Sequence, residues 1–110
     1  MRDTASDSRA TALNATKMAR NDNSLRAQYE RILGAPLGEF DVLCFRFRNV
    51  SALRQYNWLA LMHNLSGLLY DASEDRCTVT TVFDKGSKNA EKARRIAVEE
   101  MEASEITPIL

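Results

Sequence analysis

Histidine is the scarcest reactive residue in this chain of 110 residues, which contains one copy. A single imidazole cannot form the histidine pair that many metal sites use. The two cysteines, Cys44 and Cys77, stand far apart and match no metal-binding spacing. The sequence therefore predicts no metal and no other cofactor, and we expect both cysteines to lie in strands as small hydrophobic residues.

Net charge is lacking as well, because fifteen basic and fifteen acidic residues cancel. The chain therefore has no long-range electrostatic attraction to nucleic acid or to a membrane surface. No apolar run approaches the roughly 20 residues that a membrane-spanning helix needs. The N-terminal sequence MRDTASDSRATA also lacks the apolar region of a secretion signal. These absences predict a cytoplasmic protein with no membrane partner.

What the chain does contain is ordinary for a globular domain, with 45% hydrophobic and 27% charged residues. A chain of this length is long enough for one hydrophobic core and too short for two. The first twenty residues are small and polar, so we expect residues 1–20 to form a flexible or frayed arm. Residues 21–110 are expected to form a single domain.

The hydrophobic pattern of residues 21–110 changes several times between helical and strand periods. Apolar residues recur every three or four positions in three predicted helices, at about 24–33, 52–65 and 89–103. Strand-like patterns occur in four segments, at about 39–48, 68–70, 77–83 and 106–110. Ser51 is expected to cap the second helix and Gly67 to end it.

This order is a helix followed by β-α-β-β-α-β, which resembles ferredoxin-like domains in the order of elements alone. The resemblance implies an α+β fold, with an antiparallel sheet that carries two helices on one face. Within the first strand, Leu43, Phe45 and Phe47 alternate with polar residues, so we expect them to face the helices. Arg46 and Arg48 then point to the opposite side.

The second helix is the most informative segment, because its side chains are apolar nearly all the way round from Tyr56 to Met62. A helix on a sheet needs an apolar stripe on one side, so this pattern indicates burial on more than one side. Either the first helix covers the second face, or a partner does, most simply a second copy of the chain.

Tyrosine and tryptophan are enriched at interface hot spots. The predicted partner-binding residues are Tyr56, Trp58, Leu59, Met62, Leu25 and Tyr29. The leading hypothesis is therefore a non-catalytic interaction protein, a small regulatory or assembly factor that acts as a homodimer.

A nucleic-acid-binding domain is the first alternative. Its phosphate contacts would come from the basic residues Arg46, Arg48, Arg54, Lys85 and Lys88. RNA-binding sheets stack bases on exposed aromatic residues, and here the aromatic residues of the strand are expected to face the core.

Two weaker hypotheses concern small ligands. The segment from Lys85 to Lys88 contains a glycine and precedes a helix, as anion sites do, but it lacks the phosphate-loop pattern. An enzyme with a pocket between helices and sheet would use His63, Tyr56 or Trp58. No third residue is evident that would orient such a catalytic group.

Overall fold

The computed structural model describes residues 24–108 and residue 110. The arm expected at residues 1–20 lies outside the described residues. The described residues belong to two units, residues 24–32 with 110 and residues 33–108, and each unit is described by itself. Within them, no helix combines the length and the apolar character needed to cross a membrane. The cytoplasmic location stays a prediction.

The first unit contains most of α2 (Leu25–Leu33), the helix expected at 24–33. The hydroxyl oxygen of Ser24 accepts a hydrogen bond from the backbone N–H of Ala27 at 3.2 Å. This serine therefore occupies the N-cap position, where its side chain satisfies one of the free N–H groups of the first turn. Gly34 follows the helix with a φ of +76°, a left-handed conformation typical of helix ends.

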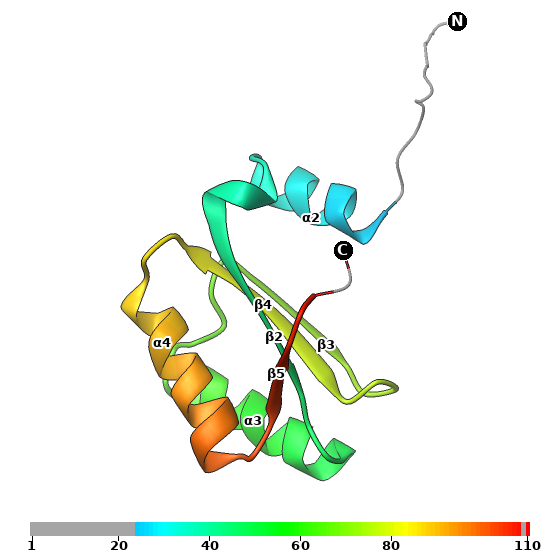
Figure 1. Ribbon diagram of the computed structural model, residues 1–110, viewed down its shortest axis with the longest axis vertical. Helices are drawn as coiled ribbons and strands as arrows, with labels where there is room; N and C mark the ends of the chain where they lie inside the picture. Colours follow the sequence, from blue (N-terminus) through cyan, green and yellow to red (C-terminus); the bar gives the residue numbers. More distant parts are fainter. Residues whose placement is uncertain (1–23, 109) are drawn as a thin grey trace, which may run out of the picture. The chain divides into compact units, whose positions relative to one another are not determined.

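The second unit is an α+β arrangement with a four-stranded antiparallel sheet, which confirms the predicted fold class at this level (Figure 1). The strand order is β3-β4-β2-β5. The strands are β2 (Phe40–Arg46), β3 (Leu69–Ser73), β4 (Thr78–Asp84) and β5 (Ser104–Ile106). The helical elements are η2 (Leu37–Glu39), α3 (Val50–Met62), α4 (Lys88–Arg94) and the π-helical η3 (Arg95–Glu100), which continues α4.

The register of β2 and β4 decides which side chains face the helices. Phe45 lies opposite Val79, and both are completely buried. Because successive side chains of a strand point to opposite faces, the alternate positions of β2 face the other way. Leu43, Phe45 and Phe47 therefore belong to the core face, as predicted from their alternation. Arg46 lies on the opposite face and is exposed.

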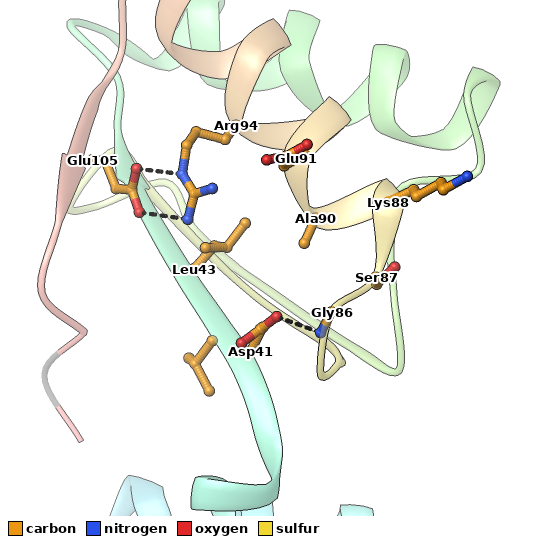
Figure 2. Close-up of a pocket in the computed structure, with 10 residues that line it drawn as sticks. Asp41, Leu43, Gly86, Ser87, Lys88, Ala90, Glu91, Arg94 and Glu105 are labelled. Atoms are coloured by element: carbon orange, nitrogen blue, oxygen red, sulfur yellow. Dashed lines mark hydrogen bonds and ion pairs between the residues drawn. The ribbon is translucent and has the colours of Figure 1, made fainter.

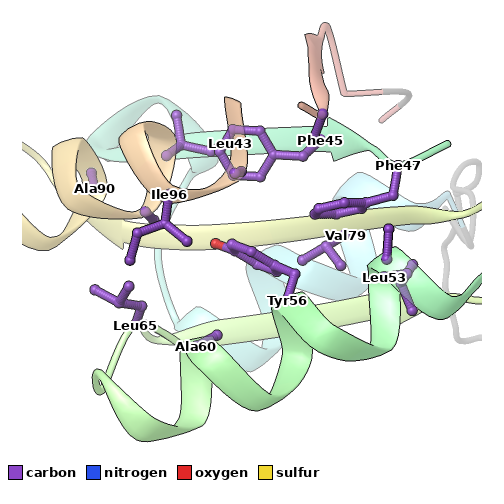
Figure 3. Close-up of a cluster of buried hydrophobic side chains, with 14 of the residues drawn as sticks. Leu43, Phe45, Phe47, Leu53, Tyr56, Ala60, Leu65, Val79, Ala90 and Ile96 are labelled. Atoms are coloured by element: carbon purple, nitrogen blue, oxygen red, sulfur yellow. The ribbon is translucent and has the colours of Figure 1, made fainter. Parts of the chain in front are cut away.

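The core lies between this face and the helices α3 and α4 (Figure 3). Tyr56 of α3 is at its centre, with its ring 5.1 Å from that of Phe47 and 6.0 Å from that of Phe45 between centroids. Such tilted and edge-on ring pairs add to the stabilisation that burial itself provides. The helices contribute mainly Leu53, Tyr56, Ala60, Ala90, Ala93, Ile96 and Ala97.

The second helix begins and ends at residues other than those expected. Asn49, not Ser51, is the N-cap, since its side-chain oxygen accepts a hydrogen bond from the N–H of Ala52 at 2.8 Å. The helix ends before Asn64, which adopts a φ of +59°. The N–H of Leu65 then bonds to the carbonyl of Ala60 at 2.7 Å, which closes a Schellman turn. This places the Leu65 side chain in the core as the hydrophobic contact of the turn.

Gly67, expected to end the helix, instead allows the chain to enter β3. Its φ is +67°, and a side chain there would meet the backbone oxygen of Val82 at 2.4 Å. The next residue, Leu68, donates its N–H to that same oxygen at 2.8 Å. Glycine is therefore required for close approach of the two backbones.

Several strand boundaries also differ from the expectation, and β3, expected at 68–70, runs from Leu69 to Ser73. Cys77 lies in the turn before β4 rather than in the strand, with a φ of +55°, and its N–H bonds to the carbonyl of Glu74 at 3.3 Å. The last strand, expected at 106–110, is β5 (Ser104–Ile106). Pro108 lacks the N–H that a continued ladder would need.

Candidate functional site

The outward side of α3 carries the largest concentration of exposed apolar side chains in the described part of the chain. Trp58, Leu61 and Met62 are 60%, 74% and 61% exposed. Residues three and four apart on a helix lie on the same side, so these three side chains form one continuous stripe. We call these three residues the α3 outer face. Six large hydrophobic side chains are exposed among the described residues, and half of them lie in this short stretch.

The size of this stripe is comparable with known functional patches. The exposed fractions of the three side chains correspond to roughly 350 Å² of apolar surface, if a large side chain buries about 150–250 Å². The largest apolar patch on an ordinary monomeric protein measures about 300–600 Å² and is often functional. The α3 outer face is therefore large enough to be the contact surface of this molecule.

A charged pair borders the α3 outer face on its N-terminal side. Arg54, one helical turn before Trp58, donates from Nε and Nη2 to the two carboxylate oxygens of Glu74 at 2.9 and 3.0 Å. This hydrogen-bonded pairing raises the pKa of Arg54 and lowers the pKa of Glu74. Since Glu74 lies in the turn between β3 and β4, the pair fixes the guanidinium beside the helix.

The structure separates the predicted partner-binding residues into surface and core. Trp58 and Met62 are exposed, whereas Tyr56 is completely buried and belongs to the core. Tyr56 is therefore a core residue and not part of the exposed surface of α3, contrary to the prediction. Leu59 is partly buried and packs against the core. In α2, Tyr29 is buried and Leu25 is partly exposed. The expectation that the first helix covers α3 stays a prediction.

Sequence reasoning did not select Leu61, the most exposed residue of the stripe, or Glu74. Helical spacing could have predicted Leu61 as part of this surface, because it lies three positions after Trp58 and thus on the same side of the helix. No sequence pattern predicts the contact of Glu74, since it is twenty residues away from Arg54 in the sequence and meets it only through the fold.

The basic residues proposed for nucleic acid do not all lie at the same end of the sheet. Arg48 forms an ion pair with Glu102 at 2.7 Å, and Lys85 donates to the carbonyl of Gly38 at 2.9 Å. Arg46 lies opposite Thr78, at the end of β2 that is distant from Lys85. At about 3.3 Å per residue, the length of this strand separates the two ends by roughly 20 Å. Arg54 is held by Glu74, and the exposed Lys88 is the first residue of α4.

A hollow of about 460 Å³ lies between the first half of β2 and the start of α4 (Figure 2). It includes the glycine turn considered as an anion site. The backbone N–H that an anion would need is already used, because the Gly86 N–H donates a hydrogen bond to Asp41 Oδ2 at 2.9 Å. On the other side of the hollow, Arg94 is paired through two hydrogen bonds with Glu105, at 2.8 and 3.3 Å. A carboxylate beside the turn repels phosphate, so this geometry does not favour an anion.

The three residues considered for catalysis do not converge on a cavity. His63 is exposed at the C-cap of α3, Trp58 is exposed, and Tyr56 is in the core. Burial raises the pKa of Tyr56 to about 12, further from physiological pH than its ordinary value. Among the described residues, no group of three or more histidine, cysteine or acidic side chains is placed to hold a metal ion.

Two buried hydroxyls stand out within the core. Tyr56 Oη and Thr81 Oγ1 have no hydrogen-bond partner in the described structure. Tyr70, which lies opposite Thr81 on the neighbouring strand, donates its hydroxyl to Asn57 Oδ1. Its pKa is raised by burial and by the proximity of Tyr56. An unsatisfied buried hydroxyl costs about 1–3 kcal/mol, so these groups lower stability rather than add to it.

Comparison with known proteins gives no further indication. No protein-family model matches the chain, and no curated protein and no solved structure matches it at a significant level.

Proposed function

We propose that this protein is a non-catalytic interaction module, a small regulatory or assembly factor, that binds a second copy of itself through the α3 outer face. The observation that carries the proposal is the exposure of Trp58, Leu61 and Met62, each at 60% or more. Exposed side chains of this size gain roughly 25 cal/mol per Å² when a partner removes them from water.

The fold itself does not require these apolar residues. The core side of α3 is formed by Leu53, Tyr56 and Ala60, which are buried within the second unit. Polar residues on the outward side would leave this packing unchanged and would be better solvated. The apolar stripe is therefore explained by contact with a partner more readily than by folding.

A second copy is the simplest occupant that the surface supports. Two copies of the stripe would remove roughly 700 Å² of apolar surface from water, and the neighbouring polar side chains would add to this. Specific interfaces bury about 1,200–2,000 Å² in total, so the interface lies at or below the lower limit. A reversible dimer of micromolar affinity is the expected consequence, rather than an obligate one.

We also infer that the scaffold is ferredoxin-like. The support is the chain order β2-α3-β3-β4-α4-β5, together with the antiparallel sheet order β3-β4-β2-β5 and the placement of α3 and α4 against one face. Many unrelated functions occur on such a scaffold, so the functional proposal depends on the α3 outer face and not on the fold.

Intrinsic fluorescence tests the proposal directly, because Trp58 is the only tryptophan. On dilution from high to low micromolar concentration, we expect its emission to shift to longer wavelength and its quenching by acrylamide to increase. A Leu61→Asp variant is the matched control and should resemble the diluted protein at every concentration. Emission that is independent of concentration in the unmodified protein would contradict association through this face.

A further inference from the structure

We propose that the two copies pack their α3 helices antiparallel, about a two-fold axis beside Trp58, and that Arg54 determines this orientation. This inference rests on the proposed function and specifies the geometry of the same surface.

The outward side of α3 is divided into a polar and an apolar half with Trp58 between them. Arg54 and Gln55 precede Trp58 by four and three positions, and Leu61 and Met62 follow it by three and four. In an antiparallel pair centred on Trp58, each position faces the one at the same distance on the other side of the centre. Met62 of one copy then lies against Arg54 of the second copy, and Leu61 lies against Gln55.

This pairing suits the side chains involved. The methylene groups of arginine and glutamine cover apolar surface while their polar ends stay in water. The two indole rings meet at the centre of the interface, where hot-spot residues concentrate. A parallel pair would instead place Arg54 beside Arg54 of the second copy, and like charges in contact select against that arrangement.

The charges at the helix ends favour the same orientation. The last turn of α3 contains no basic residue, so the negative end of its dipole is not compensated within the helix. Antiparallel packing brings Arg54 of the second copy to this end. The carbonyls of Ala60 and Leu61 already accept the N–H groups of Leu65 and Asn64, so Arg54 acts on this end through its positive charge. Glu74 occupies Nε and Nη2 of the guanidinium and leaves Nη1 available as a donor.

Disulfide trapping distinguishes the two orientations. In a Cys77→Ser background, we would prepare Gln55→Cys and Leu61→Cys variants and oxidise them separately and as a mixture. A disulfide needs Cα atoms about 4.4–6.8 Å apart. In the antiparallel dimer, position 55 faces position 61, whereas the two copies of position 55 are displaced by about 9 Å along the helices.

The expected result is a mixed 55–61 disulfide formed at least tenfold faster than either disulfide between identical variants. An Asn89→Cys variant, exposed on α4, mixed with Leu61→Cys controls for random collision and should give little product. A dimer in which 55–55 and 61–61 disulfides form faster, or no disulfide forms, overturns this geometry but leaves association intact. A protein that sediments as a monomer at high micromolar concentration overturns both proposals.

Discussion

The helices α3 and α4 pack against the same face of one sheet, yet their outward sides differ. The outward side of α4 is charged, with exposed Lys88, Glu91 and Arg94, and η3 continues it with exposed Arg95 and a Val98 that is 37% exposed. The outward side of α3 is apolar and includes an exposed tryptophan. Both helices bury a stripe of apolar residues against the sheet, so folding makes the same demand on each.

The charged side of α4 shows what a helix in this position needs when it faces only water. Folding alone therefore gives no reason for the exposed Trp58, Leu61 and Met62 on α3. Exposed charged residues cost little and preserve solubility, whereas an exposed apolar stripe favours self-association. The contrast between the two helices supports the proposal that the molecule associates through α3.

The largest expected effect is the difference in stability loss between alanine substitutions on the buried and the exposed side of α3. Leu53 is completely buried, and a Leu53→Ala substitution should lower the free energy of unfolding by about 2–5 kcal/mol because it leaves a cavity in the core. The matched control on the outward side, Leu61→Ala, should change it by less than about 0.5 kcal/mol. Urea denaturation at low protein concentration measures both. Equal losses would mean that the outward side is also buried in the folded monomer.

The buried side of α3 should also make the free energy of unfolding depend on pH, through Tyr56. The pKa of Tyr56 is raised by burial from 10.0 to about 12, so the unfolded chain ionises at a lower pH than the folded one. The stability that this group contributes is complete below pH 10 and is lost as the pH rises toward 12, by roughly 2–3 kcal/mol. Denaturation across this range should therefore show decreasing stability.

Tyr56→Phe is the control for that titration. The variant should be as stable as the original protein or more stable at neutral pH, because it removes an unsatisfied buried hydroxyl. It should also lose less stability above pH 10, although Tyr70, whose pKa is raised too, still contributes. An identical alkaline transition in both proteins would show that Tyr56 is not buried as described.

Giving α3 the polar outward side of α4 should have a smaller effect on folding. A Trp58→Gln, Leu61→Glu, Met62→Lys variant should unfold within about 1 kcal/mol of the original protein at low concentration, since exposed positions contribute little. Its unfolding midpoint should also be independent of concentration, whereas dimerisation makes that of the original protein rise with concentration. A strongly destabilised variant would place these residues in the core of the monomer.

The smallest expected effect concerns the charged border. Glu74→Gln should leave the thermal midpoint essentially unchanged, because exposed ion pairs add little to stability. It should weaken the dimer a few-fold, as Arg54 is no longer held in place. Breaking the matched exposed pair on the α4 side, with Glu105→Gln, should leave dimerisation unchanged. If both substitutions weakened the dimer equally, Arg54 would have no special role in orientation.

Periodicity in the sequence was sufficient to predict the α+β class and the core side of β2. Once helices cover one face of the sheet, the alternating apolar side chains of Leu43, Phe45 and Phe47 must point to that face. Helix ends were less predictable, because several residues can cap. Asn49 competes with Ser51, and Asn64 ended α3 before Gly67 by adopting a left-handed conformation.

The candidate site was predictable only in part, for a related reason. The apolar excess of α3 is visible in the sequence, but its division into core and surface depends on the rotation of the helix on the sheet. That rotation buries Tyr56 and exposes Leu61. The ion pair between Arg54 and Glu74 depends on the hairpin turn, which lies far away in the sequence.

Sedimentation equilibrium over a wide concentration range, with the unmodified protein and the Trp58→Ala variant, tests the central claim most directly. We expect a reversible monomer–dimer equilibrium in the micromolar range, and a variant that dissociates at least tenfold more readily. An unmodified protein that remains a monomer at high micromolar concentration, or a dimer equally stable in both proteins, would contradict it.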